Sequence, residues 1–194
     1  MNTLKAEKRS MDVKAKKLRR EGFVTGNVFG RDLESSIPVK MQKSDVERLL
    51  KSIHKGSQIM LDVEGKLYNV LIKEVQYNSM AGRVDEIDFQ ALVSDEKVNS
   101  VAEVILENHE KVAEGVLQLL ISEIPYKAYP SALVDSVKVD VGHMHVGDSI
   151  KVKDLDLAKN EEIELSEDPE AVVAVVSAVH NSVPAQESEE STEE

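Results

Sequence analysis

The chain has 194 residues, 41% of them hydrophobic, and a formal net charge of −12, which allows one sizeable core or two small ones. It has no cysteine, which excludes a disulfide framework and a thiolate zinc site and is typical of a reducing cytoplasm. Because neither an export signal nor a run of eighteen apolar residues occurs, we expect a cytoplasmic protein without a membrane span.

The charge is segregated along the chain. Residues 1–20 hold eight cations and two acids, a net +6 inside a chain of −12. Such a run can neutralise several phosphates and release their counterions, and arginine can also bind phosphate with two hydrogen bonds. The alternative is that these cations solubilise a mobile terminus. We favour a polyanion partner, with RNA the first candidate. The densest cations are Lys14, Lys16, Lys17, Arg19 and Arg20.

The first half of the chain predicts a compact β domain with one helix. Ser44 and Glu47 form a capping-box pattern, and the apolar residues that follow at helical spacing predict about three turns before Gly56. Alternating apolar residues on both sides of Glu64–Gly65 predict a β-hairpin, with its first strand from residue 58. A further strand is expected over residues 86–93.

The second half has a different charge and a β pattern of its own. Residues 1–93 carry a net +4 and residues 94–194 a net −16, which predicts two domains with different partners. We place the boundary in the polar stretch 94–100, giving domains over 1–93 and 94–180. Residues 181–194 lack the apolar surface needed to fold and are expected to be a disordered acidic tail. Short strands are expected around 101–108, 116–124, 133–141, 148–152, 161–165 and 171–179.

The motifs of catalysis and of metal or cofactor binding are missing. The sequence has no G-x-S-x-G nucleophile elbow, no G-x-G-x-x-G loop and no Walker sequence. His143 and His145 can share one face of a strand, but no cysteine or carboxylate pair nearby completes a metal site. We therefore expect no enzyme activity, no metal and no cofactor.

Several dispersed segments, in one order, resemble a known family. Leu18-Arg19-Arg20-Glu21-Gly22, Val28-Phe29-Gly30, Val75-Gln76 and Ile87-Asp88-Phe89 resemble the bacterial ribosomal protein L-twenty-five family, which binds 5S rRNA. The second half, with Val137-Lys138-Val139-Asp140-Val141 and Val146-Gly147-Asp148-Ser149, resembles the extra domain of its long, Ctc or general stress protein form. The resemblance implies a six-stranded β-barrel with flanking helices that grips 5S rRNA, followed by a mostly β domain directed away from the RNA.

The resemblance also implies which residues contact RNA, and two of them depart from the family pattern. Phe29 stands where the family has Tyr and lacks the phenolic hydroxyl, while Glu86 stands where the family has His and adds an anion. Val24 and Thr25 replace sequence that usually contains proline. The implied RNA-binding residues, with Arg20 added from the basic run, are Arg9, Lys14, Lys16, Lys17, Arg19, Arg20, Phe29, Gln76, Glu86 and Asp88.

Two functional hypotheses remain open. The leading one is a structural constituent of the large ribosomal subunit that binds 5S rRNA, does no catalysis, is a monomer off the ribosome, and contacts neighbouring ribosomal proteins through its acidic second domain. The alternative is a divergent, stress-related paralogue with weakened 5S rRNA binding that acts as a ribosome-associated protein-interaction module. The acidic residues around Glu86 motivate the alternative, because an anion beside RNA is repelled.

Overall fold

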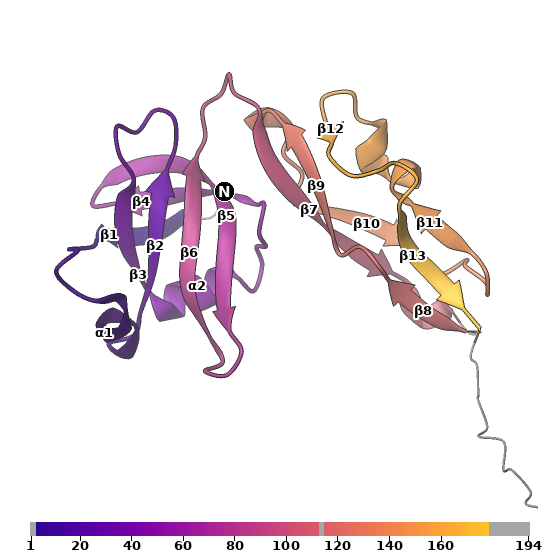
Figure 1. Ribbon diagram of the computed structural model, residues 1–194, viewed down its shortest axis with the longest axis horizontal. Helices are drawn as coiled ribbons and strands as arrows, with labels where there is room; N and C mark the ends of the chain where they lie inside the picture. The colour runs from indigo at the N-terminus through magenta and orange to yellow at the C-terminus, as the bar shows by residue number, and fades with distance from the viewer. Residues whose placement is uncertain (1–2, 113–114, 179–194) are drawn as a thin grey trace, which may run out of the picture.

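A computed structural model describes residues 3–112 and 115–178 of the chain, so the predicted acidic tail lies outside the described residues. In the described part the protein is mainly β with short helices, which confirms the predicted fold class (Figure 1). The elements of the first half are β1 (Thr3–Lys8), α1 (Ala15–Arg20), β2 (Phe23–Phe29), β3 (Ile37–Gln42), α2 (Lys43–Leu49), β4 (Gln58–Val63), β5 (Lys66–Asn78) and β6 (Arg83–Ala91).

The six strands of the first half close into a barrel in the order β1-β3-β2-β6-β5-β4, which confirms the expected six-stranded barrel. Closure comes from β1 and β4, which run parallel with Leu4 opposite Leu61. Side chains alternate between the inside and the outside of each strand, and Leu61, Ile87 and Phe89 are completely buried. A closed barrel leaves no sheet edge open, so its outer polar side chains are what this half presents to partners.

The basic residues at the start of the chain belong to the barrel domain. β1 places Leu4 and Ala6 in the core, while Lys5 and Lys8 face outward. Helix α1 follows and buries Leu18. Six of the eight cations of residues 3–20 therefore lie on this strand or this helix, and Arg9 and Lys14 lie in the segment that connects them.

Helix α2 is shorter than predicted and begins two residues earlier. It spans Lys43–Leu49, its N-cap is Gln42, and no side chain caps it, so the predicted capping box at Ser44 is wrong. After Leu49 the chain turns toward β4, and Ile53 still reaches the barrel core although it lies beyond the helix. The helical spacing identified the buried face correctly, because a short turn continues the same side of the helix.

The predicted hairpin and the last barrel strand are present, with details that the sequence did not indicate. Glu64 and Gly65 connect β4 to β5 with φ values of 53° and 88°, as the tight turn requires. The pairing of β5 with β6 shifts register twice and leaves Lys73 and Asp85 without a cross-strand partner. These two β-bulges bend the sheet and, at Asp85, turn a backbone carbonyl toward α1.

The second half forms two small sheets around one core. A four-stranded sheet has the order β10-β7-β9-β12, and a three-stranded sheet has the order β11-β13-β8. Tyr126 is completely buried, and its hydroxyl both accepts from the Val134 N–H at 2.8 Å and donates to the Val134 carbonyl at 2.9 Å. The strands are β7 (Val98–Glu107), β8 (Val116–Leu119), β9 (Glu123–Ala128), β10 (Ser136–Asp140), β11 (Ser149–Lys151), β12 (Glu164–Leu165) and β13 (Val172–Ser177).

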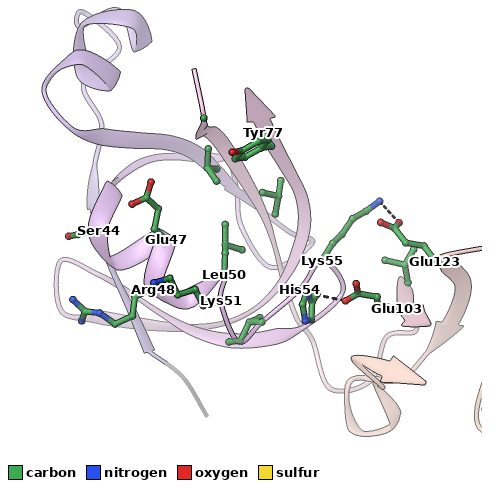
Figure 2. Close-up of a pocket in the computed structure, with 15 residues that line it drawn as sticks. Ser44, Glu47, Arg48, Leu50, Lys51, His54, Lys55, Tyr77, Glu103 and Glu123 are labelled. Atoms are coloured by element: carbon green, nitrogen blue, oxygen red, sulfur yellow. Dashed lines mark hydrogen bonds and ion pairs between the residues drawn. The ribbon is translucent and has the colours of Figure 1, made fainter. Parts of the chain in front are cut away.

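The two halves meet where the loop before β4 packs against β7 and β9. Strand β7 already begins at Val98, so the last residues of the stretch predicted as a junction belong to a strand, and Ser100 is buried. The Ser100 hydroxyl donates to the Gly56 carbonyl at 3.2 Å, and Lys55 pairs with Glu123 at 2.9 Å. Beside this contact lies a cleft of about 880 Å³, which Figure 2 shows with Tyr77 on one wall.

Candidate nucleic-acid interface

The outer surface of β2, β6 and β5 brings three of the predicted site residues together. The parallel pairing of β2 with β6 places Asn27 opposite Asp88, and the antiparallel pairing of β6 with β5 places Gln76 opposite Glu86. Ile87 lies between the two acids in sequence and is completely buried, so Glu86 and Asp88 both face outward. We call this surface, together with α1, the α1–β6 face.

Arg19 attaches α1 to this surface. Its Nε donates to the Asp85 carbonyl at 3.0 Å and its Nη2 donates to the Thr25 hydroxyl at 3.3 Å, while the Glu86 carboxylate lies 3.6 Å from Nη2. The β-bulge supplies the acceptor, because Asp85 has no cross-strand partner. Only 22% of the Arg19 side chain is exposed. Two of its five N–H groups therefore donate to acceptors inside the protein.

The acids of the α1–β6 face have partners of their own. The Asp85 carboxylate accepts from the Asn78 amide at 3.1 Å and from Arg83 Nε at 2.8 Å, and these groups hold its pKa below the usual range. Asp88 Oδ1 accepts from both the backbone and the side-chain N–H of Asn27, at 3.1 and 3.3 Å. Glu86 has Arg19. The predicted repulsion between these acids and RNA is thus partly offset within the protein.

The other cations of α1 remain exposed to solvent. Lys14 is the N-cap residue of the helix, and Lys17 lies 3.9 Å from Glu21 across one turn, a weak surface pair. The exposed cations of this segment are Lys14, Lys16, Lys17 and Arg20. Arg9 differs from them: it is half-buried and donates through Nη2 to the Val13 carbonyl at 3.2 Å. Arg9 thus braces the loop before α1.

Phe29 lies further along the same surface. It ends β2, is opposite Gln90 of β6, and is 37% exposed, so its ring offers a face for stacking. Sequence reasoning missed Asn27 and Thr25, which lie on the outer side of β2 between Phe29 and α1. They could have been found from the alternation of side chains in a strand, because the second and fourth residues before Phe29 lie on the same side of β2 as Phe29.

Other candidate sites do not form. Among the described residues no three His, Cys, Asp or Glu side chains group to hold a metal, and His145 has only Asp148 beside it at 3.7 Å. None of the ten predicted RNA-binding residues lines the cleft of Figure 2. No helix in the described ranges is both long and apolar enough to cross a membrane.

A cationic helix on a closed β-barrel, with a polar outer surface beside it, is suited to a protein that contacts a polyanion such as RNA. Two family models match: residues 4–89 match the Ribosomal L25p family, and residues 97–180 match the C-terminal domain of ribosomal protein TL5. The chain belongs to the Ribosomal L25p family, in the long form that carries this second domain. This confirms the resemblance read from the sequence.

Relatives along nearly the whole chain agree. The large ribosomal subunit protein bL25 of Carboxydothermus hydrogenoformans is 33% identical over 96% of this chain and 95% of its own length. The proteins of the same name from Thermosipho africanus and Akkermansia muciniphila are 33% and 30% identical, over 91% of this chain and 85% and 89% of their own lengths. The protein is a structural constituent of the large ribosomal subunit in the cytoplasm, and not an enzyme, as predicted.

Proposed function

We propose that the protein binds 5S rRNA within the large subunit through the α1–β6 face. The observation that carries this proposal is the arrangement of charge: exposed cations sit on a helix that Arg19 docks onto a polar, outward-facing strand surface. Cations on a helix can contact phosphates, and the adjacent strands offer hydrogen-bonding groups for the shallow minor groove of an RNA helix.

The residues divide the work by chemistry. Lys14, Lys16, Lys17 and Arg20 contact phosphates and supply most of the affinity, because they are exposed and cationic. Gln76 and Asp88 hydrogen-bond to 2′-hydroxyls or base edges. The two bonds from Asn27 both end on Asp88 Oδ1, and the described residues supply no bond to its Oδ2, so Oδ2 can accept from RNA.

The remaining site residues support this contact. Phe29 stacks on a base or packs on a ribose, a role that does not need the hydroxyl of tyrosine. Arg19 and Arg9 hold α1 and its preceding loop in place from inside the protein. Glu86 pairs with Arg19 and adds an anion to the face, so it opposes the phosphates electrostatically rather than contacting RNA.

We propose a division between the two halves that follows the charge. Residues 1–93 form the RNA-binding domain, and residues 94–180 form a domain that contacts other components of the subunit, with the acidic residues 181–194 beyond it. The internal partners of Asp85, Glu86 and Asp88 favour RNA binding over the protein-interaction alternative, because that alternative depended on these acids being uncompensated.

A binding titration tests the proposal. The purified full chain is titrated against 5S rRNA and against an unrelated structured RNA of equal length, at low and at physiological salt. We expect at least about a tenfold preference for 5S rRNA that persists at physiological salt, since groove contacts are less salt-sensitive than phosphate contacts. Equal, weak binding to both RNAs that physiological salt abolishes would contradict it.

A further inference from the structure

The second half of the molecule has open sheet edges, unlike the closed barrel. Its two sheets end in the strands β10, β12, β11 and β8. An edge strand presents a row of unpaired backbone N–H and C=O groups to which another chain can pair. Proteins usually protect such edges with charged side chains, prolines, bulges or very short strands.

Three of these four edges are protected. β10 carries exposed Lys138 and Asp140. β12 has two residues, and β11 has three residues with a register shift between Ile150 and Lys151. Each device interrupts or repels an incoming strand.

Within residues 3–112 and 115–178, the β8 edge carries no charged side chain, proline or bulge, and it is apolar. Its residues Val116 and Leu119 are 45% and 39% exposed, and Leu120, which follows the strand, is 58% exposed. Val146, 44% exposed, adjoins the start of β8, because a Cβ atom on Gly115 would lie 2.9 Å from Val146 Cγ2. Four of the large exposed apolar side chains of the described residues therefore lie along β8 or beside its two ends, at one edge of the sheet.

Among the described strands, none pairs with the outer side of β8. β13 occupies the inner side, with Val116 opposite Ser177 and Leu119 opposite Ala174. The Leu120 N–H donates to the Val173 carbonyl at 2.9 Å, which fixes the alternation of the antiparallel pair. By this alternation the N–H and C=O groups of Leu117 and Leu119 point away from β13.

We propose that the β8 edge docks an extended, positively charged polypeptide segment of another component of the large subunit, which adds a strand to the sheet. Strand addition satisfies the outward groups of Leu117 and Leu119, and the apolar side chains of β8 supply contact area. The inference rests on the place of the chain in the large subunit and goes beyond 5S rRNA binding.

Charge selects the kind of partner. Residues 94–194 hold 23 acidic and seven basic residues, so two copies of this domain repel each other, whereas a cationic segment is attracted. The chain also continues beyond β13, which pairs with β8, into a sequence with five glutamates between positions 187 and 194. A second copy of this chain is therefore the disfavoured occupant.

Photocrosslinking identifies the occupant. A benzoylphenylalanine replaces Leu120 in the full chain, which is bound to purified large subunits from cells that lack this protein and then irradiated. We expect a crosslink to one ribosomal protein, in an extended segment rich in Lys and Arg. A crosslink to rRNA, a crosslink to a second copy of this chain, or no crosslink would overturn the inference.

A lysine placed on the β8 edge tests whether the partner pairs with β8 as an added strand. Leu119→Lys in the same crosslinking chain should reduce the crosslink at least about tenfold, because an edge lysine opposes an incoming cationic strand. Ser149→Lys, on β11 at the opposite edge of the same sheet, is the matched control and should leave the crosslink unchanged. Equal yields from the two variants would contradict strand addition.

Two further measurements keep the outcomes distinct. Circular dichroism melting checks that each variant is folded, and Val116→Lys replaces Leu119→Lys if the latter does not fold. The 5S rRNA titration is repeated on every variant. If the unaltered chain does not bind 5S rRNA, the proposed function is contradicted. In that case the docking proposal is still decided by crosslinking the chain to the proteins of the large subunit after the RNA has been removed.

Discussion

Arg19 is the residue at which the sequence pattern and the structure give different roles. Its position in a basic helix indicates a phosphate contact, yet its guanidinium donates to a backbone carbonyl and a hydroxyl of the barrel. Hydrogen bonds from a charged donor to partly buried acceptors stabilise a fold more than a solvated surface pair does. Arg19 is therefore a positioning residue for α1.

Replacing Arg19 tests this role through stability rather than through RNA. Arg19→Ala should lower the free energy of unfolding by about 1–2 kcal/mol, because the Asp85 carbonyl and the Thr25 hydroxyl lose their charged donor. Urea denaturation measures the change. Lys16→Ala, on the exposed side of the same helix, is the control and should shift stability by less than about 0.5 kcal/mol. Similar small shifts in both variants would show that Arg19 does not anchor α1.

Glu86 lies at the border between internal pairing and RNA contact. Glu86→Gln removes one negative charge from the α1–β6 face and releases Arg19 from its ion pair. Affinity for 5S rRNA should rise about two- to fivefold at low salt and change less at high salt, since the gain is electrostatic and screened. Filter binding at two salt concentrations measures it. Unchanged affinity at low salt would place Glu86 away from the RNA.

The residues that meet on the barrel surface were partly predictable. Glu86 and Asp88 are two apart in one strand, so alternation alone places them on one side. The role of Arg19 was not predictable, because it depends on a β-bulge that turns the carbonyl of Asp85 toward a helix 66 residues earlier. No local pattern in the sequence indicates which strand residue will be left unpaired.

At the scale of elements, α1 should carry the salt dependence of RNA binding. The double variant Lys16→Ala/Lys17→Ala removes two exposed cations without removing an anchor of the helix. The slope of log affinity against log salt should fall by about 1.5, since each phosphate contact contributes about 0.7–0.9. Affinity should fall similarly for 5S rRNA and for the unrelated RNA.

A matched lysine in the second domain provides the control. Lys127→Ala removes an exposed cation from β9 and should leave the slope unchanged. An unchanged slope in the double variant, measured in the same titrations, would show that these two lysines of α1 do not meet the phosphates.

Element boundaries show where sequence patterns succeed and fail. The turn at Glu64 and Gly65 was predictable, because a glycine between two alternating apolar runs favours the left-handed backbone that a tight hairpin turn needs. The start of α2 was not: a capping-box pattern was present at Ser44, but β3 runs directly into the helix and makes Gln42 the N-cap. Tertiary connection overrode the local signal. The exposed apolar residues of β8 were not predictable either, because their exposure depends on which strand ends the sheet.

At the scale of the whole molecule, one glycine controls how closely the two domains approach. A Cβ atom on Gly56 would lie 2.1 Å from the Val101 carbonyl oxygen of the second domain, and Gly56 has φ +88°. Gly65 has the same φ, but nothing lies within 4 Å of its Cβ position. Comparing substitutions at the two glycines therefore distinguishes the effect of backbone strain, which both share, from the effect of the contact between the domains, which only Gly56 makes.

Gly56→Ala should destabilise the protein by about 2 kcal/mol more than Gly65→Ala, because only the former adds a clash to the shared backbone strain. Small-angle scattering should also show a larger radius for Gly56→Ala, as the contact through Ser100 and Lys55 opens. Equal losses and equal radii in the two variants would mean that the domains do not pack through this loop.

The closing pair of the barrel sets an order of events during synthesis. β1 cannot pair with its parallel partner until Leu61, opposite Leu4, has been synthesised. The cationic helix α1 cannot dock until Asp85 in the last barrel strand has been synthesised, because Arg19 binds its carbonyl. Pairing between such distant segments is slow and comes late in folding. The lysines of α1 are therefore synthesised long before α1 can dock on the barrel. If α1 binds RNA as proposed, selective binding begins only after the sixth strand has left the exit tunnel.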